Sequence, residues 1–565
     1  MMKKRFWEND HELIPPIRIY KETDRWKRIR CDGDDDDDEI NEDIEALYSN
    51  VMQHVMKNYV NLTHQTIVDT MLDIKCCARC IFRFLGVRDY KYYAKSEEVL
   101  LKVLNRIRIS SSTLQEETQH PSTNILLFKT PDKPICLTCF DLLYQADTMD
   151  CLWPIIENFN SHNFQVNTFS LSISLPSGVI INNHSVKVYI RQKYRERNLS
   201  VDLSNVVDLK DPFKHLLGWS IEKELDLKYN YQSPFNISIE YYHENTQQNH
   251  LILTDIPSAE FKLKKIRMKG KAVWTGDSRH NIIAALEKVP DSDFISIGNC
   301  PPLEVKERWK NYPPKLEHSA VYVGGRYTKL SREISQSPWI INDVRLAKTS
   351  VSECIGDILR EKFRCDDYNF AGAGREDVNV RMLGNGRPFY FEIINPRKPF
   401  LSQQELDDAQ KEINEIQKDL IQINHLTMVS ERDLAIIKEG EETKRKTYSA
   451  LIWISKIVTP EIIDKINEYQ NKELTIKQQT PIRVLQRRAQ MVRPKIIYSM
   501  KAETLENHFL TLQLQTEAGT YIKEFIHGDL GRTKPNLGDL LDCYADIMAL
   551  DVLEVDLEWP PNNNN

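Results

Sequence analysis

One carboxylate of the chain is well placed to take part in chemistry. Asp377 follows the small residues Ala373 and Gly374 and lies between Arg375 and Arg381. Nearby cations favour the ionised form of a carboxylate, and a loop of small residues lets a substrate backbone approach closely. The same residue types also occur in surface turns with solvated charges, so this pattern alone leaves both interpretations open.

Four cysteines form a second candidate site. They occur as two CxxC pairs, Cys77 with Cys80 and Cys136 with Cys139. Zinc binds four soft ligands in a tetrahedron, and one CxxC turn can present two thiolates to the ion. Because cysteine fills all four positions, none is left for water, and we expect a structural Zn²⁺ site without catalytic function.

Cys76 adjoins the first pair, but only Cys77 has the two-residue spacing to Cys80. The cysteine pattern also allows two other interpretations. Four buried structural cysteines without a metal would give the same pattern. Redox-active dithiols fit less well, because two pairs suit one tetrahedral site better than two separate disulfides.

Strand-like runs follow Asp377. Residues 377–383 and 388–394 alternate in polarity and are joined by Gly384, Asn385 and Gly386. Asn-Gly between two such runs is a strong hairpin signal, because both residues tolerate positive φ. The sequence therefore predicts a β-hairpin with Asp377 at its mouth.

Further elements are predicted in the C-terminal half. Ser402 and Glu405 have capping-box spacing, and apolar residues at helical intervals predict a helix over 403–424. Residues 447–454 and 509–516 read as strands, and a helix is expected to begin near Tyr521. Strands and helices alternate without a regular βαβ rhythm, which favours an α+β fold.

The chain is too long for one compact core. At 565 residues it should form two or more domains, and a Pro-rich stretch at 299–314 is the candidate linker. Strand-like alternation also occurs at 164–175 and 236–242. We expect a disordered acidic tail at 1–45, domains at 46–300 and 301–561, and a disordered Asn tail at 562–565.

The distribution of charge is compatible with a nucleic-acid partner. The net charge is −7, but residues 1–50 hold fifteen of the 82 acids and nine of the 75 bases, which leaves the rest nearly neutral. The sequence contains no run of about 18 apolar residues, so no membrane span is expected. The N-terminus also lacks the apolar core of a secretory signal. Together with the cysteine pattern, this predicts an intracellular protein of the nucleus, the cytoplasm or both.

Three ordered motifs carry a resemblance to a known family. Gly374 to Asp377 is similar to the Gly-Arg-x-Asp pattern around the catalytic aspartate of pseudouridine synthases. With the runs at 446–453 and 518–535, it resembles the tRNA pseudouridine synthase ten family of archaea and eukaryotes from about Gly325 to Pro561. The CxxC pairs also match this family's N-terminal region, which carries a THUMP-like RNA-binding domain.

The resemblance implies a role for each site residue. Asp377 would be the nucleophile, and Lys523 would pair with it and lower its pKa. Tyr448 would stack on the uracil, while Tyr521 and Arg375 would line the same pocket. One departure is visible, since the family pattern has Asp at position 379 and this chain has Asn379. A neutral residue there would change the local charge more than the chemistry.

The resemblance also implies the reaction. The expected enzyme isomerises a T-loop uridine of tRNA, or its 5′ neighbour, after base flipping and with no organic cofactor. The expected fold is a synthase domain with a mixed or antiparallel sheet and an RNA cleft, beside a zinc-containing THUMP-like α+β domain. We expect tRNA as the partner, no membrane contact, and a monomer.

Two other classes of protein share some of these sequence features. A zinc-containing RNA-binding protein could retain the scaffold without activity, although the presence of Asp377, Tyr448 and Lys523 together disfavours it. A THUMP-bearing methyltransferase would need a glycine-rich cofactor loop, which the sequence does not show. Two basic stretches, over 483–495 and 262–271, are candidates for contact with RNA.

Overall fold

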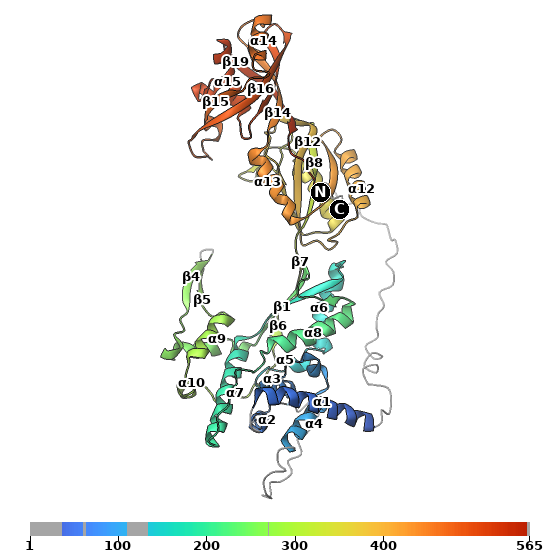
Figure 1. The fold of residues 1–565 in the computed structure, drawn as a ribbon, viewed down its shortest axis with the longest axis vertical. Helices are drawn as coiled ribbons and strands as arrows, with labels where there is room; N and C mark the ends of the chain where they lie inside the picture. The colour runs from blue at the N-terminus through green and yellow to red at the C-terminus, as the bar shows by residue number, and fades with distance from the viewer. Residues whose placement is uncertain (1–36, 60–63, 110–133, 269–270, 487, 562–565) are drawn as a thin grey trace, which may run out of the picture. The chain divides into compact units, whose positions relative to one another are not determined.

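The computed structural model describes residues 37–59, 64–109, 134–268, 271–486 and 488–561 (Figure 1). Within them the chain forms two compact units and passes between these more than once. Of the described residues, unit 1 takes those within Met1–Tyr144, Pro176–Leu216 and His243–Trp309. Unit 2 takes the described residues within Gln145–Leu175, Leu217–Tyr242 and Lys310–Asn565. The domain boundaries predicted at residues 45, 300 and 561 remain predictions.

Unit 1 is mainly helical. Its long helices include α7 (Ser177–Glu196), whose residues Ile181 and Val188 pack in an apolar core with Phe294. The other helical segments that lie in unit 1, wholly or in part, are α1 (Asp37–Asn58), α2 (His64–Asp73), α3 (Ala78–Phe84), η1 (Tyr90–Ala94), α4 (Glu97–Ile109), α5 (Leu142–Gln145), α8 (Lys210–Leu225), η3 (Glu244–Thr246), η4 (Asn249–Thr254), η5 (Pro257–Ala259), α9 (Arg279–Lys288) and α10 (Asp291–Ile297). A two-stranded ribbon, β4 (Lys264–Met268) with β5 (Lys271–Thr275), completes the unit.

A ten-stranded mixed sheet dominates unit 2, with the strand order β13-β8-β12-β19-β14-β17-β16-β15-β18 and β11 paired to β12. Only the β12–β19 pair within it is parallel among the described residues. The strands are β8 (Val321–Lys329), β11 (Asp367–Gly372), β12 (Val380–Ile394), β13 (Ile421–Val429), β14 (Lys446–Ile454), β15 (Leu474–Gln479), β16 (Val492–Glu506), β17 (Phe509–Thr516), β18 (Thr533–Lys534) and β19 (Ala545–Val555).

The rest of unit 2 surrounds these strands. A smaller sheet holds β1 (Thr168–Ser174), β2 (Lys228–Tyr229), β3 (Phe235–Tyr242), β6 (Lys310–Asn311) and β7 (Lys315–His318). A ribbon pairs β9 (Ile340–Ile341) with β10 (Val344–Arg345). The helices are α6 (Met149–His162), α11 (Val351–Phe363), α12 (Gln403–Ile416), α13 (Leu434–Thr443), α14 (Pro460–Asn467), α15 (Ile522–His527) and α16 (Leu537–Leu541), with short turns η6 (Glu431–Asp433), η7 (Ile482–Val484) and η8 (Gly528–Gly531). This mixture of helices and a mixed sheet confirms the predicted α+β class.

The hairpin prediction at residues 377–394 was wrong. Strand β12 continues through Gly384 to Gly386, and both of its ends pair with β8. Met382 pairs with Lys329 but Arg387 pairs with Tyr327, so the intervening residues form a bulge and no turn. The positive φ angles of Gly384 (58°) and Gly386 (75°) fall within this bulge, where glycine adopts them without steric cost.

The helix predicted over 403–424 was too long. The capping box of Ser402 and Glu405 is present, but α12 ends at Ile416. Ile421 and Ile423 belong to β13, where they are buried at alternate positions and pair with β8. Apolar residues at this spacing fit either period over so short a run, and pairing with β8 decided between them.

Other predicted elements are confirmed. The runs at 447–454 and 509–516 are β14 and β17, and α15 begins directly after Tyr521. Strands β1 and β3 lie within or overlap the two segments expected in the N-terminal half. Helix α1 begins at Asp37, so the end of the predicted acidic tail is helical, and residues 1–36 and 562–565 lie outside the described residues.

The bulge in β12 can be tested with two glycines of similar φ. A Cβ at Gly386 would lie 2.6 Å from the Tyr327 carbonyl oxygen, whereas one at Gly531 (φ 86°) would approach only Lys534 Cε, at 3.9 Å. We expect Gly386→Ala to cost about 3 kcal/mol of stability and Gly531→Ala about 1 kcal/mol, measured by denaturant unfolding. Equal losses would contradict the steric role given to Gly386.

Candidate active site

A cavity of about 1210 Å³ in unit 2 brings the predicted catalytic and substrate-binding residues together. It opens between strands β12, β14 and β19, the turn η7, and the segment that leads into α15. Its lining includes all five residues singled out from the sequence, which are Arg375, Asp377, Tyr448, Tyr521 and Lys523. Residues up to 146 positions apart in the chain thus meet around one carboxylate.

Asp377 is held at one of its two oxygens. Lys523 Nζ donates to Asp377 Oδ2 at 2.9 Å and to Asn379 Oδ1 at 3.1 Å. Arg483 Nη1 lies 3.5 Å from the same Oδ2. Among the described residues no donor contacts Oδ1, and the side chain is 45% exposed. One carboxylate oxygen is therefore fixed and the other is free to meet a substrate.

The surroundings of Asp377 favour its ionised form. Partial burial raises the pKa of this carboxyl, but the hydrogen bond and charge of Lys523, with the charges of Arg483 and Arg375, outweigh burial and hold the pKa below its ordinary value. Because Asn379 is neutral, it shares Lys523 without competing for its charge. Asp377 is therefore a carboxylate at neutral pH.

The residue before Asp377 points the opposite way. Glu376 is fully buried in an ion pair with Arg387, with 2.8 Å between Oε2 and Nε. Tyr327 Oη donates to both oxygens of Glu376, at 2.8 and 3.0 Å. Arg387 also donates to the Ala373 carbonyl at 2.7 Å, and Gln336 donates to that of Gly374 at 2.8 Å. This network fixes the loop that presents Asp377.

A buried lysine also holds the loop that carries Asp377. Lys329, fully buried at the end of β8, donates to the carbonyls of Val378 at 2.7 Å and Asp377 at 3.3 Å. Burial lowers its pKa to about 8, although the Glu376 charge opposes the shift. Sequence reasoning missed Lys329. The available signal was its place on the inward side of β8, two residues after the buried Tyr327.

The two tyrosines reach the cavity from different elements. Tyr448 lies on the central strand β14, and burial raises the pKa of its hydroxyl. Tyr521 precedes α15, and its hydroxyl accepts from Arg488 Nη1 at 3.1 Å. Both tyrosines therefore line the cavity that contains Asp377.

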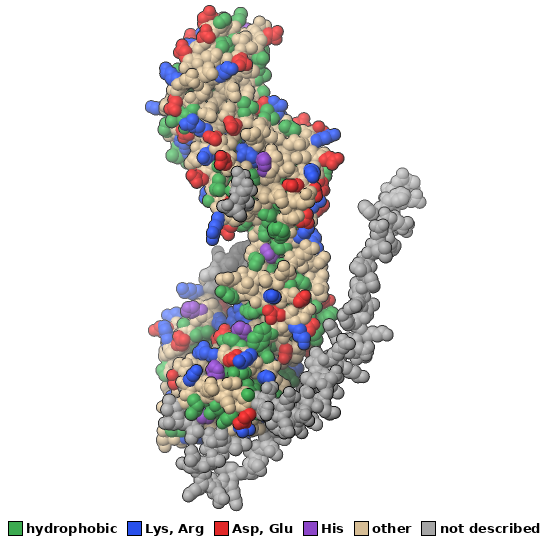
Figure 2. Space-filling view, turned by 45° about the vertical axis from the view of Figure 1, so that its right-hand side comes forward, with side chains coloured by type: hydrophobic (Ala, Val, Ile, Leu, Met, Phe, Trp, Pro, Cys, Tyr) green, Lys and Arg blue, Asp and Glu red, His purple; other side chains and the backbone are tan. Residues whose placement is uncertain are grey.

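The two basic stretches fall in different units. Arg483 and Arg488 line the cavity of unit 2, while Lys495 forms an ion pair with Glu517 at 2.7 Å. The second stretch falls on the β4–β5 ribbon, and its Lys269 lies outside the described residues. On the face shown in Figure 2, blue Lys and Arg side chains lie among red Asp and Glu side chains.

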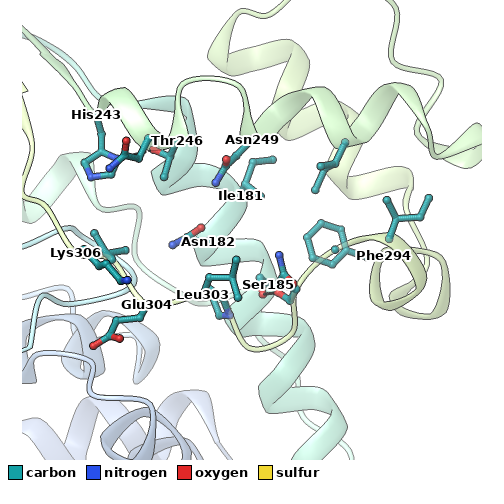
Figure 3. A pocket seen from close by; sticks show the side chains of 17 residues that line it. Ile181, Asn182, Ser185, His243, Thr246, Asn249, Phe294, Leu303, Glu304 and Lys306 are labelled. Atoms are coloured by element: carbon teal, nitrogen blue, oxygen red, sulfur yellow. Dashed lines mark hydrogen bonds between the residues drawn. The ribbon is translucent and has the colours of Figure 1, made fainter.

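Unit 1 contains a smaller cavity, of about 300 Å³ (Figure 3). Asn182 and Ser185 of α7 face His243 and Thr246 across it. Two polar side chains of its walls are bonded to the protein: His243 contacts Thr246 Oγ1 and the Glu307 carbonyl at 3.0 Å each, and Asn182 donates to the Leu137 carbonyl at 2.9 Å.

The four predicted cysteine ligands also meet in unit 1. The Sγ atoms of Cys77, Cys80, Cys136 and Cys139 all lie within 4.8 Å of one another and are buried. Burial raises the pKa of the Cys136 thiol, but hydrogen bonds from neighbouring thiols outweigh it and hold the pKa well below its ordinary value. The cluster could hold one metal ion.

A buried cation adjoins this cluster. The guanidinium of Arg83, which is 2% exposed, lies 3.6 Å from Cys80 Sγ. It also donates to the Val207 carbonyl at 3.1 Å and to Asn183 Oδ1 at 2.9 Å. Four thiolates around a divalent ion carry a net charge of −2, so a buried guanidinium offsets part of it.

No helix among the described residues is long and apolar enough to cross a membrane. The observed features define a class of protein: an α+β catalytic unit with an ionised aspartate in an open cavity, accompanied by a unit with a four-cysteine cluster.

Comparisons with known proteins identify the family within this class. Residues 322–556 match the family described as "Pus10, C-terminal", and residues 136–310 match "Eukaryotic Pus10, N-terminal". The chain is 34% identical over 524 residues to "tRNA pseudouridine synthase Pus10" of Homo sapiens, covering 88% of this chain and 97% of the relative. The chain therefore belongs to the Pus10 family, in its eukaryotic form.

Archaeal relatives match a shorter region. The protein of the same name from Pyrococcus furiosus is 38% identical over 244 residues, covering 43% of this chain and 58% of the relative. Among solved structures, "Crystal structure of pseudouridylate synthase" aligns with 45% of this chain and 73% of its own, at 13% identity and a TM-score of 0.17.

The opposite environments of Glu376 and Asp377 predict opposite responses to the loss of one charge. Glu376→Gln leaves the buried Arg387 without its counter-ion, so we expect a loss of about 3 kcal/mol in the free energy of unfolding. Asp377→Asn removes a half-exposed charge, and we expect a change within about 1 kcal/mol. Denaturant unfolding measures both, and a tolerated Glu376→Gln would refute the structural role of the pair.

Proposed function

We propose that this chain is a tRNA pseudouridine synthase that isomerises a T-loop uridine with Asp377 as its nucleophile. The curated relatives that match it over most of its length are named as tRNA pseudouridine synthases. The observation that carries the proposal is the free Oδ1 of an ionised Asp377 inside a cavity large enough for a nucleotide.

The proposed reaction needs no organic cofactor. Isomerisation breaks the N1–C1′ bond, turns the uracil and forms a C5–C1′ bond, while the proton of C5 is lost and N1 gains one. Atoms and electrons balance within the nucleotide and solvent. A carboxylate beside the sugar can manage an electron-poor C1′, as it does in other glycosidic chemistry. Addition to the base or glycal formation through C2′ would employ the same aspartate.

Each neighbour of Asp377 has a proposed role. Lys523 keeps the carboxylate ionised and oriented through its 2.9 Å contact. Tyr448 stacks on the uracil, and Tyr521 and Arg375 hold the sugar and phosphate at the edge of the cavity. Asp377 acts on the reacting nucleotide and Lys523 acts through Asp377, whereas Tyr448, Tyr521 and Arg375 bind the nucleotide.

A uridine within a folded tRNA loop must leave its stack before Asp377 can reach it. We therefore include base flipping in the proposal, with the cavity of unit 2 as the receiving site. The T-loop uridine that becomes pseudouridine is the target, with its 5′ neighbour as a second site. The N-terminal region binds RNA as a THUMP-like domain, through shape and phosphate contacts.

We propose Zn²⁺ as the ion of the cysteine cluster. A tetrahedron with Zn–S bonds of about 2.3 Å has S–S edges of about 3.8 Å. The Sγ atoms of Cys77 and Cys139 are 3.8 Å apart, which fits this geometry. Such an ion would tie two distant segments together and would stabilise unit 1 without entering the reaction.

The assignment of Asp377 can be tested on an unmodified tRNA transcript. Native protein should form pseudouridine in the T-loop, and Asp377→Asn should form none while still binding the tRNA, because the amide cannot act as the nucleophile. Pseudouridine mapping and filter binding measure the two properties.

Asp542→Asn is the matched control for this test. Its carboxylate, 98% exposed, lies outside the cavity, and its left-handed backbone (φ 51°) suits asparagine. This variant should modify the transcript normally. Native protein that binds the tRNA tightly without modifying it would refute the proposed reaction.

The metal proposal can be tested with two adjacent cysteines. Cys77→Ser should lose most of the bound zinc, because it removes one of the four ligands. Cys76→Ser should retain about one zinc per chain, since Cys76 lies beside the cluster but outside it. Elemental analysis of the purified variants gives the metal content. Equal zinc loss in both, or none in the native protein, would contradict the assignment.

A further inference from the structure

A second cation contacts Asp377 from outside the motifs that singled it out. Arg483 lies on η7, in the segment that joins β15 to β16. Its guanidinium is 44% exposed and bridges two carboxylates, with Nη1 3.5 Å from Asp377 Oδ2 and Nε 2.7 Å from Glu524 Oε1. It also lies 5.8 Å from the centre of the Tyr521 ring.

Glu524 is the buried partner of this bridge. Its side chain is 3% exposed, and Arg483 is the only described residue that hydrogen-bonds to Oε1. Oε2 has no hydrogen-bond partner among the described residues. A buried carboxylate is costly without a cation, so the closer Glu524 contact sets where the guanidinium lies.

Two cations at one oxygen constrain Asp377 more than one would. Lys523 alone would let the carboxylate rotate about its contact, and either oxygen could then face the lysine. With Arg483 on a second side, both cations engage Oδ2 and Oδ1 stays directed away from them. Correct orientation of a reacting group accounts for a large part of the rate in enzymes.

We propose that Arg483 is a positioning residue for Asp377, and that the buried Glu524 holds Arg483 in the place where it does this. What Asp377 then does rests on the proposed function, but the geometry of the bridge does not. The segment that carries Arg483 is anchored at the Ile482 amide, which donates to Asp529 Oδ2 at 3.1 Å.

Other charged groups also surround Asp377. Lys523 faces it from α15 and Arg375 from the preceding loop, while Lys329 of β8 contacts its carbonyl. Glu376 turns into the core toward Arg387. The remaining charged residues of the cavity lining are Glu441, Glu442, Lys446 and Arg488. Any test must therefore separate Arg483 from a general loss of positive charge.

The main variant is the double substitution Arg483→Gln with Glu524→Gln. Arg483→Gln alone strands the buried Glu524, and we expect it to lower the unfolding midpoint by about 4 °C or more. Adding Glu524→Gln removes the stranded charge and should restore the midpoint. A single variant as stable as the native protein would show that Glu524 does not depend on Arg483.

The protonation and exposure of Asp377 can be read without any activity. A water-soluble carbodiimide with glycinamide labels the protonated carboxyl, and peptide mass spectrometry quantifies each site. Loss of the Arg483 cation should raise the pKa of Asp377, and its labelling at pH 5.5 should increase several-fold. Labelling of the exposed Asp542 should stay the same.

Arg488→Gln is the matched control, because it removes the same charge from the same segment and cavity without touching Asp377. Labelling of Asp377 should change less than twofold in this variant. In single-turnover assays at saturating tRNA, the double variant should be about tenfold slower with little change in affinity.

Labelling of Asp377 in the double variant that equals its labelling in Arg488→Gln, or a single-turnover rate equal to that of the native protein, would overturn the proposal. Native protein that forms no pseudouridine, combined with increased labelling of Asp377 in the double variant, would refute the proposed function and leave the positioning role standing.

Discussion

The buried ion pair between Glu376 and Arg387 is the constraint on which the active site depends. It joins the loop before β12 to the strand after the bulge. Tyr327 donates to Glu376 and accepts from Gln336, while Lys329 donates to a carbonyl of the same loop. Two adjacent acids therefore serve opposite purposes. Because the buried pair is hydrogen-bonded both to Tyr327 and to the loop, it restrains the backbone that presents the half-exposed Asp377. Removal of one partner would leave an unpaired charge in the core of the sheet.

The cations around Asp377 follow from the same arrangement. The ten-stranded sheet brings together β12, β14 and β19, and α15 delivers Lys523 across the cavity. Partial burial alone would favour a protonated acid, so an ionised Asp377 requires compensating charge. Lys523 and Arg483 supply it at the same oxygen, and the neutral Asn379 lets Lys523 do so without a second carboxylate nearby. In unit 1, the buried guanidinium of Arg83 lies beside the four-cysteine cluster, 3.6 Å from Cys80 Sγ.

The sequence determined the parts of this protein whose signals are local. The Gly-Arg-Glu-Asp motif, the CxxC pairs, the capping box at Ser402 and the alternation in β17 each depend on residues a few positions apart. Such signals predicted the α+β class, the aspartate, the cysteines and the family, because local chemistry and backbone propensity leave a short-range pattern. Even Tyr448 and Lys523 could be placed beside Asp377 only by their motifs, not by any periodicity.

Several features depend on partners far along the chain, and tertiary contacts determine them. The Gly384–Gly386 segment reads as a turn, but pairing of both flanks with β8 makes it a bulge. Residues 421–423 fit a helix, and strand pairing with β8 overrides that. Glu376 and Asp377 are neighbours of one type, and nothing local shows which is buried. Lys329, Arg483 and Glu524 acquire their positions through contacts across 41 to 49 residues or more, and no short-range pattern encodes such contacts.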